Sequence, residues 1–453
     1  MNESSMVAQP ALDREAELDR LEGLVRDALR QARDLGASDA EVHASSSQGL
    51  SVGVRLGEVE TLEHMQDRGV TVTVYIGRRK GQASSADLST SSIAACVGHA
   101  MDIARFTQED PCNGLANPDL LATEQRNLDL WHPSAVDASF AIERALACEA
   151  AGREDPRISN SEGAAFNAGL GLTVYGNSNG FVGRRAGTRY SQSCVLLAGS
   201  GDGMQRDYGY DSRRCLDDLE DVRRTGEEAA RRTTQRLGAG QLPTAEMPIL
   251  FDPRVATGLI GHLVGAVTGS ALYRNATFLK GRAGDRLFPE WLMLEERPWL
   301  KRGASSAWFD AEGVATRKRR LVDAGVLDGY VLSSYSGRRL GLETTANAGG
   351  VRNLLLPAGG ERQGNLLSSL DEGFYVTEVM GQGVNLVTGD YSRGASGFLV
   401  KKGNIVQPIE EVTIAGNLET MFADIVAAGD DIDTRGNVHC GSLLLRKMMV
   451  AGS

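Results

Sequence analysis

A histidine and a cysteine stand side by side near the end of the chain, at His439 and Cys440 in the run HCGS. Imidazole and thiolate groups are ligands that zinc prefers in proteins, and a thiolate is also a nucleophile. Adjacent residues rarely chelate one metal ion together, so this pair would need partners from elsewhere in the chain. A metal ligand, a nucleophile and a packing residue are therefore the three interpretations of Cys440.

Three other groups of residues do not match the catalytic or binding patterns that they first suggest. Ser334 and Ser336 lack a G-x-S-x-G turn and have no histidine nearby in the sequence. The aspartates at 430–433 lack the glycine and glutamate of an EF-hand loop. The glycines at 381–383 are not followed by the Lys-Ser/Thr of a phosphate loop. We expect none of these groups to carry chemistry of its own.

Composition and charge exclude several classes of protein. The net charge of −11 argues against direct binding to nucleic acid, which normally requires a basic face. The six cysteines form no CxxC pair, so neither a disulfide framework nor a zinc ribbon is expected. The first residues have no basic region followed by an apolar stretch, and no run is long and apolar enough to span a membrane. We expect a cytoplasmic protein with no membrane partner.

The 453 residues suggest two or three domains. Helices are expected around residues 21–35, from a Ser89 cap to Phe106, over 138–152, over 216–237 and over 255–270. Strands are expected at 50–56 and 70–76, and an antiparallel meander at 157–211. We divide the chain into an N-terminal α+β domain (1–106), a linker (107–135), a central helix with a meander (136–240) and a C-terminal domain (241–453).

The second half of the chain contains five long motifs. They are SSAWFDAEGVATRKRRLVDAGVL (305–327), SYSGRRLGLETTANAGGVRNL (334–354), VTEVMGQGVNLVTGDYSRGASGF (376–398), EEVTIAGNL (410–418) and GDDIDTRGNVHCGSLLL (429–445). These motifs resemble the PmbA/TldE branch of the TldD/TldE (PmbA/TldD) metalloprotease family. The resemblance covers nearly the whole chain and is weakest in the first 40 residues and the linker. The resemblance implies an α+β fold, with an N-terminal α/β domain and a larger C-terminal mixed domain that contains antiparallel sheets.

The resemblance also identifies a helix whose metal-binding residues have been replaced. In the TldD subunit this helix carries HExxxH, in which two histidines bind zinc and the glutamate is the general base. In register, this chain has Gly261 and Ala266 at the histidine positions and His262 at the glutamate position. Cys440 falls where the family has a cysteine ligand, and we interpret it as a remnant ligand or a packing residue. We expect no metal and no catalytic residue in this chain.

The family further implies a heterodimer with a TldD-like catalytic subunit that holds the zinc. This chain would complete a chamber in which unfolded or short peptides are degraded or trimmed. Gly389, Tyr391 and Ser392 in the glycine-rich run are candidates for peptide contact. Such a segment either adds a peptide as an extra strand or uses its glycines only for tight turns. A non-enzymatic peptide-binding adaptor and an independent hydrolase that uses Cys440 are the alternatives.

Overall fold

The computed structural model describes residues 12–360 and 366–452, which form two compact units. The N-terminal unit takes the chain to Thr123 and then Asp129–Leu197 and Arg206–Arg232. The C-terminal unit takes Glu124–Leu128, Ala198–Gln205 and the chain from Thr233 onward. No helix among the described residues is long and apolar enough to cross a membrane.

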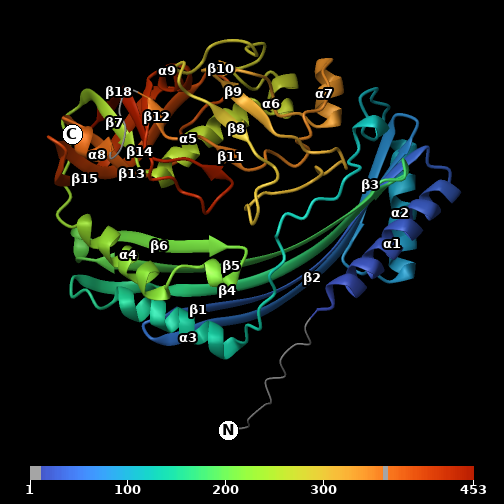
Figure 1. The fold of residues 1–453 in the computed structure, drawn as a ribbon, viewed down its shortest axis with the longest axis horizontal. Coiled ribbons are helices and arrows are strands. Elements are labelled where there is room, and N and C mark those ends of the chain that lie inside the picture. Colours follow the sequence, from blue (N-terminus) through green and yellow to red (C-terminus); the bar gives the residue numbers. More distant parts are fainter. Residues whose placement is uncertain (1–11, 361–365, 453) are drawn as a thin grey trace, which may run out of the picture. The chain divides into compact units, whose positions relative to one another are not determined.

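The N-terminal unit is built on one six-stranded sheet with the order β3-β2-β1-β4-β5-β6 (Figure 1). The strands are β1 (Asp39–Arg55), β2 (Glu58–Ile76), β3 (Arg79–Ser85), β4 (Ile158–Asn177), β5 (Val182–Ala198) and β6 (Gln205–Arg213). The antiparallel pairing of β1 with β4, from Glu41↔Asn177 to Val54↔Ala164, joins segments on either side of the predicted linker. The predicted N-terminal and central segments therefore share one sheet.

Helices cover the apolar face of this sheet. They are α1 (Arg14–Asp34), α2 (Thr90–Phe106), α3 (Ala138–Gly152) and α4 (Val222–Gln235). Leu21 and Val25 of α1 pack with Val72 of β2 in one core cluster, and Ala145 of α3 packs with Phe166 of β4 in another. Alternation of apolar and small or polar residues along the strands gives the sheet this single buried face.

The predicted start of the fourth helix at residue 216 is wrong. Residues Leu216–Asp218 form a short 3-10 turn, and α4 begins at Val222. The Asp221 carboxylate accepts a hydrogen bond of 2.8 Å from the Arg223 amide, and the Asp221 carbonyl accepts from the Thr225 amide. An aspartate that satisfies the free amides of a first turn favours a helix start at that point. The residues before Val222 therefore lie outside α4 and form a loop.

The C-terminal unit is organised around a closed ring of strands. Its largest sheet has the order β12-β16-β18-β15-β14-β13-β7, and an additional pairing of β18 with β7 closes β7, β13, β14, β15 and β18 into a barrel (Figure 1). The strands of this sheet are β7 (Ala245–Phe251), β12 (Gly359–Gly360), β13 (Glu372–Met380), β14 (Asp390–Lys401), β15 (Asn404–Asn417), β16 (Ile425–Ala428) and β18 (Leu443–Ala451). A closed ring leaves no free edge on its member strands where they pair.

Shorter elements complete the C-terminal unit. A second sheet has the order β10-β9-β8-β11-β17. Its strands are β8 (Leu294–Glu296), β9 (Arg319–Asp323), β10 (Val326–Leu327), β11 (Leu354–Leu355) and β17 (Val438–His439). The helices are α5 (Pro253–Ala266), α6 (Gly269–Tyr273), α7 (Ser334–Leu340), α8 (Leu366–Ser369) and α9 (Leu418–Ala423).

The sequence predicted the class of fold correctly, as a mixed α+β protein with an N-terminal sheet unit and a larger C-terminal unit. The predicted helix over 255–270 is interrupted, because α5 ends at Ala266 and the Thr268 side chain caps α6. The sequence also predicts a short element over residues 364–370, and the structure describes α8 from Leu366; residues 361–365 lie outside the described residues.

Glycine is required at one position inside the barrel. A Cβ at Gly397 of β14 would lie 1.9 Å from the carbonyl oxygen of Tyr375 in β13. We expect Gly397→Ala to lower the free energy of unfolding by about 1–3 kcal/mol, because the two strands would have to separate. Gly258→Ala on α5 is the control, since a Cβ there meets no atom within 4 Å. Chemical denaturation monitored by circular dichroism measures both; equal stability of the two variants would contradict the close approach.

Candidate functional site

Helix α5 is held at its start by the barrel strands. It follows β7 directly, and the Asp252 carboxylate that caps it accepts hydrogen bonds from the Arg254 amide at 3.0 Å and the Tyr375 hydroxyl at 2.8 Å. The Asp252 amide donates to the Val376 carbonyl at 2.9 Å. Pro253 occupies the first helical position, where its missing N–H costs nothing. The barrel therefore sets the position and the start of the helix.

The three positions of α5 that the resemblance aligns with HExxxH have very different surroundings. Gly261 is exposed, and a Cβ there would have open space around it. His262 is half-buried. Ala266 has no exposed surface and lies in the main apolar cluster of the unit with Leu263 and Cys440. Residues five apart on a helix are rotated by about 140°, which accounts for the contrast between positions 261 and 266.

His262 lies beside an aromatic residue of the barrel. Its ring meets the ring of Tyr391 edge-on, with the centroids 5.9 Å apart and an angle of 76° between the planes. Burial lowers the pKa of His262, and the nearby charge of Arg393 lowers it further. Burial also raises the pKa of Tyr391 to about 12, although Arg393 opposes this shift. The pair therefore consists of a neutral imidazole and a neutral phenol near neutral pH.

Cys440 is sealed inside the C-terminal unit. Its side chain has no exposed surface, and its thiol donates to the Gly441 carbonyl at 3.1 Å. Burial, with the charge of Asp431 adding to the effect, raises the pKa of the Cys440 thiol far above its usual range. A thiol of this kind is a poor nucleophile, because the reactive form is the thiolate. The adjacent His439 is half-buried on β17.

The three candidates for peptide contact lie in a tight turn and the strand that follows it. Gly389 has φ +81°, and its carbonyl accepts a 2.7 Å hydrogen bond from the Leu418 amide. The Ser392 amide donates to the Gly383 carbonyl at 2.7 Å, and its side chain is exposed. Tyr391 is buried. The backbone here is engaged within the chain, so the glycines serve the turn.

Strand addition at β14 is not available to a peptide. β14 pairs with β13 through Gly394–Lys401 and with β15 through Asp390–Lys401. At the start of β14 the remaining side is occupied by Gly383 and Val384 of the turn. A peptide that contacts this region would therefore have to use side chains, of which Ser392 and the half-buried Arg393 are accessible.

The donors present near α5 do not fit a zinc ion. Structural and catalytic zinc sites use at least three His, Cys, Asp or Glu ligands. Position 261 has no side chain, position 266 offers only a buried methyl group, and the Cys440 thiol is held in its protonated form by burial. Across residues 12–360 and 366–452, no three such ligands lie close enough together to hold a metal ion.

Comparison with known proteins places the whole chain in one family. Family models match residues 40–104 (PmbA/TldA metallopeptidase domain 1), 131–237 (central domain) and 244–452 (C-terminal domain). The metalloprotease PmbA of Escherichia coli O157:H7 is 47% identical over 441 residues, which cover 97% of each chain. The chain belongs to the PmbA/TldD metallopeptidase family. The resemblance seen in the sequence is thereby confirmed.

Solved structures of the PmbA/TldD type share the fold. A protein of Bacteroides thetaiotaomicron, described as a candidate modulator of DNA gyrase, is 27% identical and superposes with a TM-score of 0.90 over 96% of this chain and 99% of its own. TldE from Thermococcus kodakarensis is 20% identical, with a TM-score of 0.82 over 95% of this chain and 99% of its own. The latter likeness concerns the fold alone.

Sequence reasoning did not bring His262 and Tyr391 together. The two residues lie on α5 and β14, and no periodic pattern relates elements so far apart in the chain. The only signal in the sequence was a tyrosine and a histidine that each lie in a glycine-rich run, and such a signal does not name a partner.

The environment of His262 predicts a measurable titration. We expect the imidazole of the folded chain to titrate below its ordinary pKa of about 6.5, because burial and Arg393 both disfavour the imidazolium. Arg393→Gln should raise this pKa towards the ordinary value. NMR titration of the histidine ring resonances, assigned with His262→Gln, measures both values. As the pH falls below 6.5, the unfolded chain takes up the proton more readily, so His262 lowers stability on the acid side. A pKa at or above the ordinary value would refute this account.

Burial of Cys440 predicts slow reaction with thiol reagents. At pH 8 we expect iodoacetamide to label the partly exposed Cys112 and Cys215 well before Cys440, since Cys440 is both enclosed and protonated. Mass spectrometry of digested protein at successive times measures each site. In denaturant the three thiols should be labelled at similar rates, which controls for differences in the recovery of their peptides. Rapid native labelling of Cys440 would restore it as a candidate nucleophile.

Proposed function

We propose that this chain is the non-catalytic subunit of a two-chain zinc metallopeptidase. The zinc ion, the general base and peptide-bond cleavage belong to a TldD-like partner, with which the chain forms a heterodimer. The chain completes the chamber that admits unfolded or short peptides, which the complex degrades or trims. Membership in the PmbA/TldD metallopeptidase family supports the peptidase part of this proposal.

The arrangement of α5 is the observation that carries the proposal. Position 266 is enclosed by apolar neighbours, so a zinc-binding imidazole cannot occupy it without displacing the core. The glutamate position holds His262, whose pKa is lowered by burial. A neutral imidazole in this position lacks the carboxylate that would activate a metal-bound water. The helix keeps its place in the fold without the groups of a catalytic helix.

The peptide-binding part of the proposal rests on side chains at the end of α5 and the start of β14. Gly389 shapes the turn, Tyr391 covers His262, and Ser392 offers an exposed hydroxyl. Arg393 adds a positive charge beside them. We propose that Ser392 and Arg393, positioned by Gly389 and Tyr391, contact peptide substrates without reading a defined sequence, as a chamber for unfolded chains requires.

Two other functions are less well supported. An independent hydrolase that uses Cys440 would need an accessible thiolate, whereas this thiol is enclosed and its pKa is raised. A peptide-binding adaptor that joins no peptidase would share the α5 arrangement. Co-purification with a TldD-like chain distinguishes an adaptor from a subunit.

Metal analysis of the purified chain tests the proposal. After dialysis, the isolated chain should hold far less than one zinc ion and cleave no unfolded peptide. Reconstitution with a TldD-like partner should give about one zinc ion per pair and chelator-sensitive cleavage. The control is a partner in which the glutamate of HExxxH is changed to glutamine, which should keep zinc and lose activity. Near-stoichiometric zinc together with peptidase activity in the isolated chain would overturn the assignment.

A further inference from the structure

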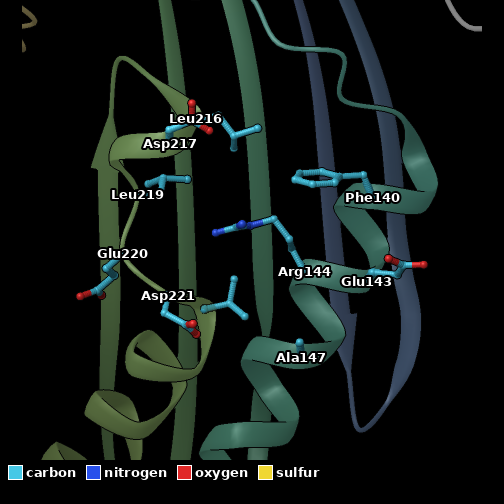
Figure 2. A pocket seen from close by; sticks show the side chains of 10 residues that line it. Phe140, Glu143, Arg144, Ala147, Leu216, Asp217, Leu219, Glu220 and Asp221 are labelled. Atoms are coloured by element: carbon cyan, nitrogen blue, oxygen red, sulfur yellow. The ribbon is translucent and has the colours of Figure 1, made fainter.

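A pocket of about 530 Å³ lies in the N-terminal unit, between α3 and the loop of residues 216–222 that leads into α4 (Figure 2). Its size falls within the usual range for small-molecule sites, about 300–1,000 Å³. Its apolar walls come from Phe140 of α3, from Leu216 and Leu219 of the loop, and from Val222 at the start of α4. Because α4 begins only at Val222, the residues before it form this loop and not a further helical turn.

A positive charge without an ion-pair partner occupies the middle of the pocket. Arg144 reaches from α3 towards the loop (Figure 2), and its Nη2 donates to Gln192 Oε1 at 2.7 Å. Its Nε is buried without a hydrogen-bond partner. Among the described residues, no carboxylate lies within ion-pair distance of this guanidinium. The charge of Asp221 favours the charged guanidinium but forms no ion pair with it. The half-buried cation can therefore still pair with an anionic ligand, because desolvation strengthens the attraction.

The guanidinium is held in place by a buried hydrogen-bond network. Gln192 is buried, and its Nε2 donates to the Glu220 carbonyl at 3.0 Å and to Thr225 Oγ1 at 2.7 Å. The Thr225 hydroxyl donates to the Glu220 carboxylate at 2.8 Å, and Figure 2 shows that this side chain points away from the pocket. Arg144 is therefore positioned before any ligand arrives, which lowers the entropic cost of binding.

Negative charge borders the same pocket. Asp217 and Asp221 lie towards opposite ends of the loop, on either side of Arg144 (Figure 2). The Asp221 carboxylate is engaged with the Arg223 amide, whereas Asp217 is exposed and free to meet a cation. Carboxylates at the border repel phosphates and other multiply charged anions. A ligand that carries one carboxylate and one ammonium group can pair with Arg144 through the first and with Asp217 through the second.

We propose that this pocket binds a short peptide with free termini and an apolar side chain. The C-terminal carboxylate pairs with Arg144, the apolar side chain packs on Phe140 and Leu219, and the N-terminal ammonium faces Asp217. A peptidase releases short peptides of this kind. A role for the pocket in sensing these products therefore rests on the proposed function. Binding to the pocket itself does not depend on zinc or on a partner.

Calorimetric titration of the full chain with leucyl-leucine tests the site. We expect saturable binding that Arg144→Gln weakens at least about tenfold, the usual loss for a hydrogen bond to a charged group. Arg153→Gln is the matched control, because this exposed arginine ends the same helix and does not line the pocket. Leucyl-leucine amide, which lacks the carboxylate, should bind the native chain about as weakly as the dipeptide binds Arg144→Gln.

A second variant examines the other end of the ligand. Asp217→Asn should weaken leucyl-leucine but leave N-acetyl-leucyl-leucine unaffected, since the acetylated peptide has no ammonium group. This exposed substitution also keeps the test decisive if Arg144→Gln does not fold. Free leucine should bind more weakly than the dipeptide, because it fills less of the pocket. Absence of dipeptide binding, or binding that neither variant alters, would overturn the site. Such a result leaves the zinc assignment untouched, because the titration uses the isolated chain without metal.

Discussion

The pairing of the last strand with the first strand of the C-terminal unit is the constraint on which this unit depends. β18 aligns Leu444 with Leu250 of β7, and β7 also pairs with β13 on its other side. β7 is thereby fixed from both sides, and α5 follows it without a free linker. Hydrogen bonds from the barrel to Asp252 then fix the point at which α5 begins.

This constraint holds α5 in place independently of the residues on its exposed side. The buried face of α5, with Leu259, Ile260, Leu263 and Ala266, is required by the core whatever the exposed residues are. Ala266 is part of that core. The exposed side of α5 makes no such contacts, so Gly261 lowers stability only through the low helix propensity of glycine. The core therefore constrains one side of this helix and leaves the residues of the other side open to change.

Local signals in the sequence predicted the elements well and their assembly poorly. The Ser89 cap and the extent of α3 follow from nearby residues, and the structure has both as expected. The length of β1 was underestimated, because the polar run Ser45–Gln48 breaks the apolar alternation while its backbone pairs with both β2 and β4. Closure of the barrel and the contact of His262 with Tyr391 join distant segments, which no local pattern encodes. The alignment of positions 261, 262 and 266 with a zinc motif comes from the resemblance alone.

The order of the strands along the chain has a consequence for biosynthesis. β7 ends at Phe251, and its second neighbour, β18, begins only at Leu443. Pairings between such distant segments form slowly, because a long loop must close first. Until β18 has been made and has paired, β7 therefore keeps one unpaired edge, and an unpaired edge invites pairing with other chains. A chaperone would protect this unit best in the interval between the appearance of β7 and the pairing of β18.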